Sequence, residues 1–230
     1  MKIIVNDVLI ARRARLGKIA TLVGLGLLIV GLIVSLVLPQ TPYFWVSLGC
    51  LLGGIVASSI GGANLGRWAR EPRADQVLAR SLKGFDDRYQ LYNYTLPAPH
   101  VLLTPTGLYV LTAMGQEGVI HYQGGKWRRD FSPGRLFRFM VDEGMGQPFV
   151  QADDEVRALQ RFLTNNELED GVEIESVVIF VHPKAQLLAE DLPRPALLPK
   201  DLKKAIRSEQ KKIPADRYRR LQELFEGQVA

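Results

Sequence analysis

The stretch that decides the fold is IATLVGLGLLIVGLIVSLVL, residues 19–38, which is followed after three residues by PYFWVSLGCLLGGIVASSIGG, residues 42–62. The two runs are 20 and 21 residues long, and neither contains a charged side chain. At about 1.5 Å per helical residue, each run matches a hydrocarbon core roughly 30 Å thick. Because unpaired backbone groups in lipid are costly, both runs are expected to be helical. The short connection predicts a transmembrane hairpin at residues 19–66.

Long apolar runs also occur in buried core helices and in signal peptides. A buried pair of core helices in a soluble protein would also be apolar, but uncharged runs of this length are rare in soluble folds. A cleaved signal peptide would have a shorter leading segment and a cleavage site flanked by small residues, and no second apolar run would follow at once. The membrane-spanning interpretation is therefore preferred.

Basic residues flank the hairpin on both sides and are missing from its loop. We expect the following residues to face anionic lipid: Arg12, Arg13, Arg15, Lys18, Arg67 and Arg70. By the positive-inside rule, this distribution predicts a multi-pass protein of the cell membrane with both termini in the cytoplasm. Residues 1–18 carry five basic groups and one acidic group, whereas residues 67–230 carry 24 and 23. The basicity is thus concentrated beside the membrane, unlike that of a nucleic-acid-binding domain.

Small residues recur every four positions in the second run, at Gly49, Gly53, Ala57 and Gly61. Residues at this spacing line one face of a helix and let two backbones approach closely. Gly24 and Gly31 offer a matching face on the first run. We prefer packing within the hairpin, and a homodimer through the second helix is the alternative. The single cysteine, Cys50, lies in this run, so no intramolecular disulfide can form.

The remaining chain divides into a basic amphipathic segment at residues 1–18, which either lies on the membrane surface or frays, and a cytoplasmic domain at residues 67–230. Periodicity predicts helices near 72–88, 150–164, 200–210 and 215–225. It predicts strands at 90–95, 99–104, 107–113, 118–122, 173–181 and 195–198, the first four forming an antiparallel meander. Residues 131–148 are expected to be a loop, with a short helix at 135–140. The fold class is an α/β or α+β domain with a mixed sheet.

Four stretches of this domain resemble the nuclease-related domain (NERD) family. They are VLARSLKGF, HVLLTPTGLYVL, GVIHYQGGKW and VVIFVHPKAQL, within the segments from Ala74 to Trp127 and from Val177 to Ile206. The resemblance covers roughly two thirds of the chain and rests on pattern and spacing. It implies a restriction-endonuclease-like fold and a site that cleaves nucleic acids with the help of a divalent cation.

The resemblance also implies which positions would carry the chemistry. The family places a carboxylate just before the strand at 100–104 and a Glu-x-Lys on the next strand, where carboxylates hold the cation and the lysine helps to activate water. Here Pro99 stands at the first position, and Thr112 and Met114 stand at the Glu and Lys positions. We interpret the nuclease centre as degenerate, and we predict no catalytic residue, bound cofactor or metal.

Three functional hypotheses remain open. The first is a membrane-anchored pseudoenzyme that uses the nuclease-like sheet to bind or organise a partner. The second is a membrane-tethered nuclease acting on DNA or RNA, with Mg²⁺ held by the displaced ligands Asp75, Glu117 and Asp130. The third is a bacterial membrane-organising or stress protein in which the anchor matters most. The expected partners are the lipid bilayer and a protein that the sequence does not name, and we do not expect nucleic acid.

Other polar residues receive structural interpretations. His100 and His121 could face one another across the sheet, but a histidine alone on a strand is more often a half-exposed sheet residue than a ligand. Asp153, Asp154 and Glu155 fit the first turn of a helix, where the dipole favours acids. Residues 200–220 carry nine basic and three acidic side chains, which suit a solvated helix face or contact with anionic lipid.

Overall fold

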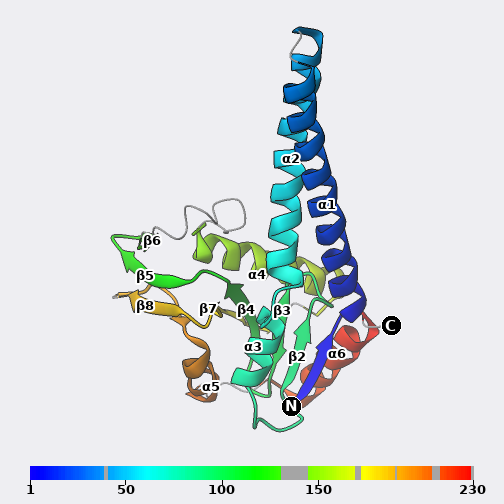
Figure 1. Cartoon of the computed structure of the whole chain (residues 1–230). Coiled ribbons are helices and arrows are strands. Elements are labelled where there is room, and N and C mark those ends of the chain that lie inside the picture. Colours follow the sequence, from blue (N-terminus) through cyan, green and yellow to red (C-terminus); the bar gives the residue numbers. More distant parts are fainter. Residues whose placement is uncertain (39–40, 131–144, 169–171, 190, 209–212, 229–230) are drawn as a thin grey trace. The chain divides into compact units, whose positions relative to one another are not determined.

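The structure is a computed structural model that describes residues 1–38, 41–130, 145–168, 172–189, 191–208 and 213–228 (Figure 1). It divides into two compact units. Residues Met1–Asn6, Ala74–Asp130 and Gly144–Ala230 form a sheet-containing unit, called the sheet domain below, and residues Asp7–Arg73 form the apolar hairpin. The sheet domain therefore contains chain from both sides of the hairpin.

The hairpin consists of α1 (Asp7–Val37) and α2 (Thr41–Trp68). Both helices are long and apolar enough to cross a membrane by length and composition. Each helix extends beyond its uncharged run, so the exposed basic residues at both ends lie on or next to the helices themselves. The expected pair of apolar helices is confirmed.

The two helices pack through glycines spaced seven residues apart. Gly17, Gly24 and Gly31 of α1 are buried. A side-chain carbon added at Gly24 would lie 2.6 Å from the backbone nitrogen of Ser58, and one added at Gly54 would lie 2.9 Å from the Gly24 carbonyl oxygen. Backbones can approach this closely only where side chains are absent.

A hydrogen bond between the helices accompanies this packing. The buried Ser47 hydroxyl donates to the Gly31 carbonyl oxygen over 2.7 Å. Such bonds contribute to helix association in an apolar environment, where few other partners are offered.

The helix-packing prediction needs correction. The contact face of α2 contains Gly61, as expected, and it also includes Ser47, Gly54 and Ser58. A side-chain carbon at Gly49 would meet nothing within 4 Å, and one at Gly53 would reach only a leucine methyl group at 3.8 Å. The reason is geometric: a four-residue step turns the helix by about 40° beyond a full circle, whereas a seven-residue step drifts by only about 20°. The seven-residue series therefore stays in contact over a longer distance.

The sheet domain is built on six strands in the order β1-β2-β3-β4-β7-β9. Their bounds are β1 (Lys2–Val5), β2 (Gln90–Asn93), β3 (His100–Leu103), β4 (Leu108–Met114), β7 (Ile174–Phe180) and β9 (Ala196–Leu197). The three central hairpin-linked strands, β2, β3 and β4, are antiparallel, whereas β1, β7 and β9 join in parallel. The expected mixed sheet is confirmed.

Helices cover both faces of this sheet. On one face, α3 (Ala74–Ser81) and α5 (Pro199–Ser208) pack through Leu78 and Leu202 onto a row that includes Leu111. On the other face, α4 (Pro148–Asn165) and α6 (Ala215–Gly227) pack through Leu159 and Phe225. Alternate residues of β4 serve the two faces, as the period of a strand requires.

A second, three-stranded sheet has the order β6-β5-β8. It comprises β5 (Gly118–Gln123), β6 (Lys126–Arg129) and β8 (Ala185–Ala189). Trp127 of β6 lies 5.4 Å, ring centre to ring centre, from the fully buried Phe180 of β7. These aromatic rings join the small sheet to the large one, so both rings belong to the core as their apolar character predicts.

Several local predictions differ from the structure. Residues 2–5 form strand β1, and α1 begins at Asp7, so residues 1–18 are not a separate amphipathic segment. The fourth strand of the expected meander belongs to the second sheet. The first helix of the domain ends at Ser81 because the chain turns at Gly84, whose φ of +92° suits glycine. The short helix expected at 135–140 lies outside the described residues.

Candidate functional site

The positions that the nuclease resemblance singles out lie at the same end of strands β3 and β4. Val101 of β3 pairs with Val110 of β4. Continuing this antiparallel register by two residues places Pro99 opposite Thr112. Both residues then lie on the face of the sheet that α4 covers, since Val110 packs in the same cluster as Leu159.

A carboxylate from α4 reaches this place. The fully buried Thr112 hydroxyl donates to Glu155 Oε2 over 2.7 Å, and the Gln151 side-chain amide donates to Glu155 Oε1 over 2.9 Å. Both oxygens of the carboxylate therefore accept hydrogen bonds from the protein. Hydrogen bonds to an ionised acceptor are stronger than those between neutral groups, so this arrangement holds the carboxylate in place.

The other two family positions, Met114 and Pro99, contribute no polar side chain to this place. Met114 is buried in a cluster that contains Phe180, and its carbonyl oxygen accepts a hydrogen bond from the Val181 amide over 2.9 Å. The Pro99 carbonyl oxygen accepts a hydrogen bond from the Tyr94 amide over 2.7 Å. A methionine sulfur and a proline ring offer a hard cation no oxygen ligand from their side chains.

The acids of the alternative metal site are placed in different parts of the sheet domain. Asp75 is buried in the first turn of α3. Glu117 lies just before β5, with Oε2 at 3.7 Å from His182 Nε2, and Asp130 follows β6, with Oδ1 at 3.0 Å from His121 Nε2. Within the described residues, no three histidine, cysteine or acidic side chains gather into a group that could hold a metal ion.

The two sheet histidines do not face each other. His100 is buried on β3 in the large sheet, where Nδ1 lies 2.8 Å from Asn93 Oδ1. His121 lies on β5 in the second sheet and is paired with Asp130. The expectation that they meet across one sheet is wrong because β5 leaves the meander.

Asp153, two residues before Glu155 on α4, forms an ion pair with Arg194. Arg194 donates to both carboxylate oxygens of Asp153, and the second of these contacts measures 3.1 Å. The hydrogen bond from Arg194 lowers the pKa of the Asp153 carboxyl below its usual range. The pair joins α4 to the segment between β8 and β9, and its planar, two-pronged geometry suits a fixed contact.

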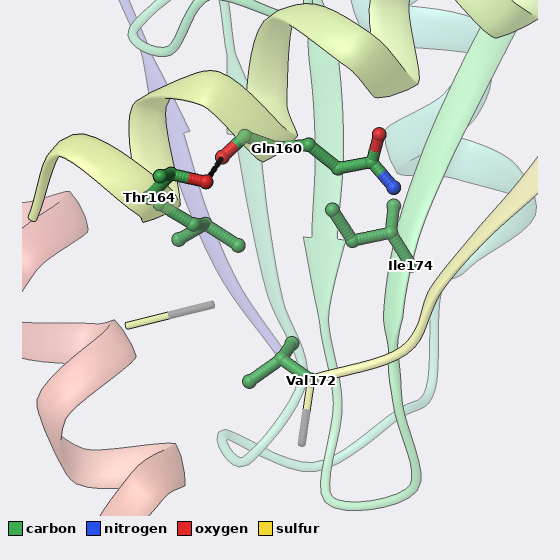
Figure 2. Close-up of a pocket in the computed structure, with 5 residues that line it drawn as sticks. Gln160, Thr164, Val172 and Ile174 are labelled. Atoms are coloured by element: carbon green, nitrogen blue, oxygen red, sulfur yellow. Dashed lines mark hydrogen bonds between the residues drawn. The ribbon is translucent and has the colours of Figure 1, made fainter. Parts of the chain in front are cut away.

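A pocket of about 380 Å³ lies at the other end of α4. It is lined by Gln160, Leu163, Thr164, Val172 and Ile174. Figure 2 shows that the Thr164 hydroxyl turns back toward its own helix, where it donates to the Gln160 carbonyl oxygen over 3.1 Å. The five lining residues include no charged group, and Glu155 is not among them.

Glu155 is the residue of this region that sequence reasoning misassigned. The helix begins at Pro148, so Asp153, Asp154 and Glu155 lie beyond its first turn. The helical period held a usable signal, because Glu155 lies three residues after the buried Ala152 and four before the buried Leu159. That spacing places it on the inner face, where an acid needs a partner.

The comparisons with known proteins agree with this architecture. The family described as nuclease-related domain (NERD) matches residues 67–181, which is half of the chain. No curated protein and no solved structure matches the chain. The matched residues include α3, β2 to β6, α4 and β7, and thus both Thr112 and Glu155. The chain belongs to the nuclease-related domain family.

Proposed function

We propose that this NERD protein is anchored in a membrane and uses its sheet domain to bind or organise a partner without cleaving nucleic acid. The observation that carries this proposal is the hydrogen bond from Thr112 to Glu155. At the position that the resemblance gives to a metal-binding glutamate, the side chain is a neutral hydroxyl that donates to a carboxylate.

Coordination chemistry supports this proposal. A magnesium ion in a nuclease-like site is held by carboxylates together with substrate phosphate oxygens. Of the three family positions, only Thr112 has a side-chain oxygen, and its proton is directed to Glu155. Glu155 itself is one carboxylate, engaged by Thr112 and Gln151. A hard divalent cation needs about six or more oxygen ligands, and Pro99 and Met114 supply none from their side chains.

Exposure supports the membrane anchor. In the most apolar 18-residue windows of α1 and α2, only 11% and 17% of the residues are buried. Large apolar side chains point outward along both helices, including Leu22, which is 69% exposed, and Trp45, also 69% exposed. A core helix pair in a soluble protein would be covered, so a lipid environment explains the exposed surface best.

The connectivity supports the proposed orientation. Residues 2–5 precede the hairpin and pair with residues 90–93, which follow it. If the hairpin spans a membrane, both of its ends must lie on the same side. The basic flanks make that side the cytoplasm. A cysteine at Gln40, in a Cys50→Ser background, should react with an impermeant thiol reagent outside the cell, and a cysteine at the exposed Lys126 should not. The reverse pattern would contradict the orientation.

A nuclease is the second candidate, because Glu155 does bring a carboxylate to Thr112. In that case Mg²⁺ would recruit Glu155 or the acids Asp75, Glu117 and Asp130 after a rearrangement. The test is incubation of supercoiled plasmid with the purified full chain in about 5–10 mM Mg²⁺ or Mn²⁺, well above the dissociation constants of weak cation sites. We expect no nicking above that of a mock purification. Nicking that disappears in Glu155→Gln or Asp75→Asn, with melting unchanged, would establish the nuclease.

Self-association through α2 is proposed as one arrangement of the anchor. Gly49 and Gly53 are exposed, and a side-chain carbon added at Gly49 would meet nothing within 4 Å. Close approach of a second α2 at these residues would suit small side chains. Cross-linking in lipid vesicles should then trap a dimer that Gly49→Leu weakens, whereas a monomer in both proteins would exclude this arrangement.

A further inference from the structure

The strand that precedes the hairpin, β1, has an unusual place in the sheet domain. It is four residues long and lies at the end of the six-stranded sheet, where β2 is its one strand partner among the residues that the structure describes. Asn6 alone separates it from α1. The remaining five strands of that sheet all come from residues 90–197, beyond the hairpin. The strand is thus bound to the domain through contacts far along the chain.

These contacts resemble those of a bound peptide. The register runs from Lys2 opposite Gln90 to Val5 opposite Asn93. Beyond the paired residues, the Lys2 amide donates to the Tyr89 carbonyl over 3.0 Å and the Asn6 amide donates to the Asn93 carbonyl over 3.1 Å. Backbone pairing of this kind gives affinity for extended peptides at a sheet edge, and alternate side chains give specificity.

Side chains fix the strand in this register. Ile4 packs against the core cluster that contains Tyr92 and Phe225, whereas the neighbouring Ile3 is 46% exposed. Lys2 Nζ lies 2.5 Å from Glu226 Oε1, which is on α6 near the end of the chain. The adjacent Met1 adds a further anchor, since its N-terminal ammonium donates to the Phe85 carbonyl oxygen over 3.0 Å and pairs with Asp87 Oδ1 at 2.9 Å. These contacts together select the segment.

Strand β2, whose edge β1 covers, is buried in the sheet domain. All four residues of β2 are buried, and Gln90 and Asn93 are polar. Removing β1 would expose apolar side chains and unpaired backbone groups, which is unfavourable and invites another strand. The β2 edge is therefore stable only when an extended segment pairs with it.

We propose that the β2 edge is a strand-acceptor site for extended apolar peptides, and that residues 2–5 occupy it as a detachable strand. The strand connects the anchor to the site, because β1 enters α1 through one residue. A displacement of α1 that pulls residues 2–5 away from β2 exposes the β2 edge. An extended peptide with an apolar residue at the position of Ile4 then binds to that edge.

The first experiment uses the full chain with Lys2, Ile3, Ile4 and Val5 replaced by glycine and serine, purified in detergent. A fluorescent peptide of residues 2–7, KIIVND, is titrated and its anisotropy measured. We expect saturable binding to this variant and binding at least about tenfold weaker to the wild-type chain, because the attached strand competes at a high effective concentration.

Two altered peptides provide matched controls. The peptide with Ile4→Asp should bind at least about tenfold more weakly, because it would bury a charge. The peptide with Ile3→Asp should bind within about threefold of the parent, because that side chain is largely solvated. A folded variant that binds no peptide, or binds all three peptides equally, would overturn the proposal.

A second experiment decides the question even if the strand-replaced chain does not fold. A zero-length carbodiimide reagent should join Lys2 to Glu226 in the full wild-type chain, and mass spectrometry identifies the linked peptides. We expect the same cross-link in Ile3→Asp and a yield at least about tenfold lower in Ile4→Asp, since a buried charge favours release of the strand. Absence of the wild-type cross-link, or equal yields in both variants, would overturn the proposal.

Discussion

The hairpin and the sheet domain are each stabilised by a different kind of packing. In the hairpin, Gly24 and Gly54 allow two helix backbones to meet because they lack side chains. In the sheet domain, large side chains such as Phe180 and Phe225 fill the space between the sheets and helices. Apolar burial removes surface from water in the domain, whereas helices surrounded by lipid gain mainly from close packing. Added volume should therefore damage the first region, and removed volume the second.

The largest effect is expected from removing volume in the domain. Phe180→Ala should lower the free energy of unfolding by about 3–5 kcal/mol, because it removes a buried ring and leaves a cavity between Trp127 and Met114. Thermal melting of the full chain in detergent measures this loss. The control is Leu188→Ala, at a position that is 58% exposed. Equal melting of the two variants would show that Phe180 is not part of the core.

Adding volume to the hairpin should have the next largest effect. Gly24→Leu places its first side-chain carbon 2.6 Å from the Ser58 nitrogen, so the helices must separate. Overpacking of this kind typically costs about 1–3 kcal/mol. Gly26→Leu is the matched control, because a side-chain carbon there meets nothing within 4 Å. Denaturation by sodium dodecyl sulfate should occur earlier for Gly24→Leu alone, and equal curves would exclude the packing described.

The polar contact of the hairpin should contribute less than its packing. Ser47→Ala removes the hydrogen bond to the Gly31 carbonyl. A hydrogen bond between two transmembrane helices contributes about 0.6 kcal/mol to stability on average. Ser59→Ala is the control, because that hydroxyl bonds to Ile55 of its own helix. The same detergent titration should separate the two variants by a small margin, and a larger loss for Ser59→Ala would reverse the assignment.

Acidification should have the smallest effect, at the point where β1 meets α6. The hydrogen bond from Lys2, followed by that from Gln222, lowers the pKa of Glu226. A lowered acid pKa contributes stability that is present above the ordinary glutamate value of about 4.3 and is lost as the pH falls through the folded-state pKa. Wild type should therefore melt slightly above Glu226→Gln at pH 7, and the difference should shrink as the pH falls below the ordinary glutamate pKa. A difference that grows on acidification would contradict this sign.

Much of the architecture could be predicted from sequence because its signals are local. The uncharged runs predicted the helices of the hairpin, and the period-two pattern of HVLLTPTGLYVL predicted β3 and β4. Strand β1 could not be predicted in this way. Its four residues pair with residues 88 positions further along the chain, and no local pattern reports such a partner.

The same limit explains the misassigned residues of the site. The positions of Pro99, Thr112 and Met114 followed from the family pattern, and extending the β3–β4 register by two residues brings the first two opposite each other. Glu155 approaches Thr112 only because α4 packs on that face of the sheet. The seven-residue spacing of the contact residues in α2 was likewise not predicted. The same helix also contains small residues at four-residue spacing, and the sequence alone does not show which of the two series faces α1.

The central claim is that the sheet around Thr112 holds no catalytic cation, and Mn²⁺ binding tests it most directly. Electron paramagnetic resonance of free Mn²⁺ would be recorded while the full chain is titrated in detergent. We expect no saturable binding with a dissociation constant below about 1 mM, which is the range of the weakest protein cation sites. Saturable binding below that value that disappears in Glu155→Gln or Asp75→Asn, with melting unchanged, would contradict the claim and place a metal centre in this domain.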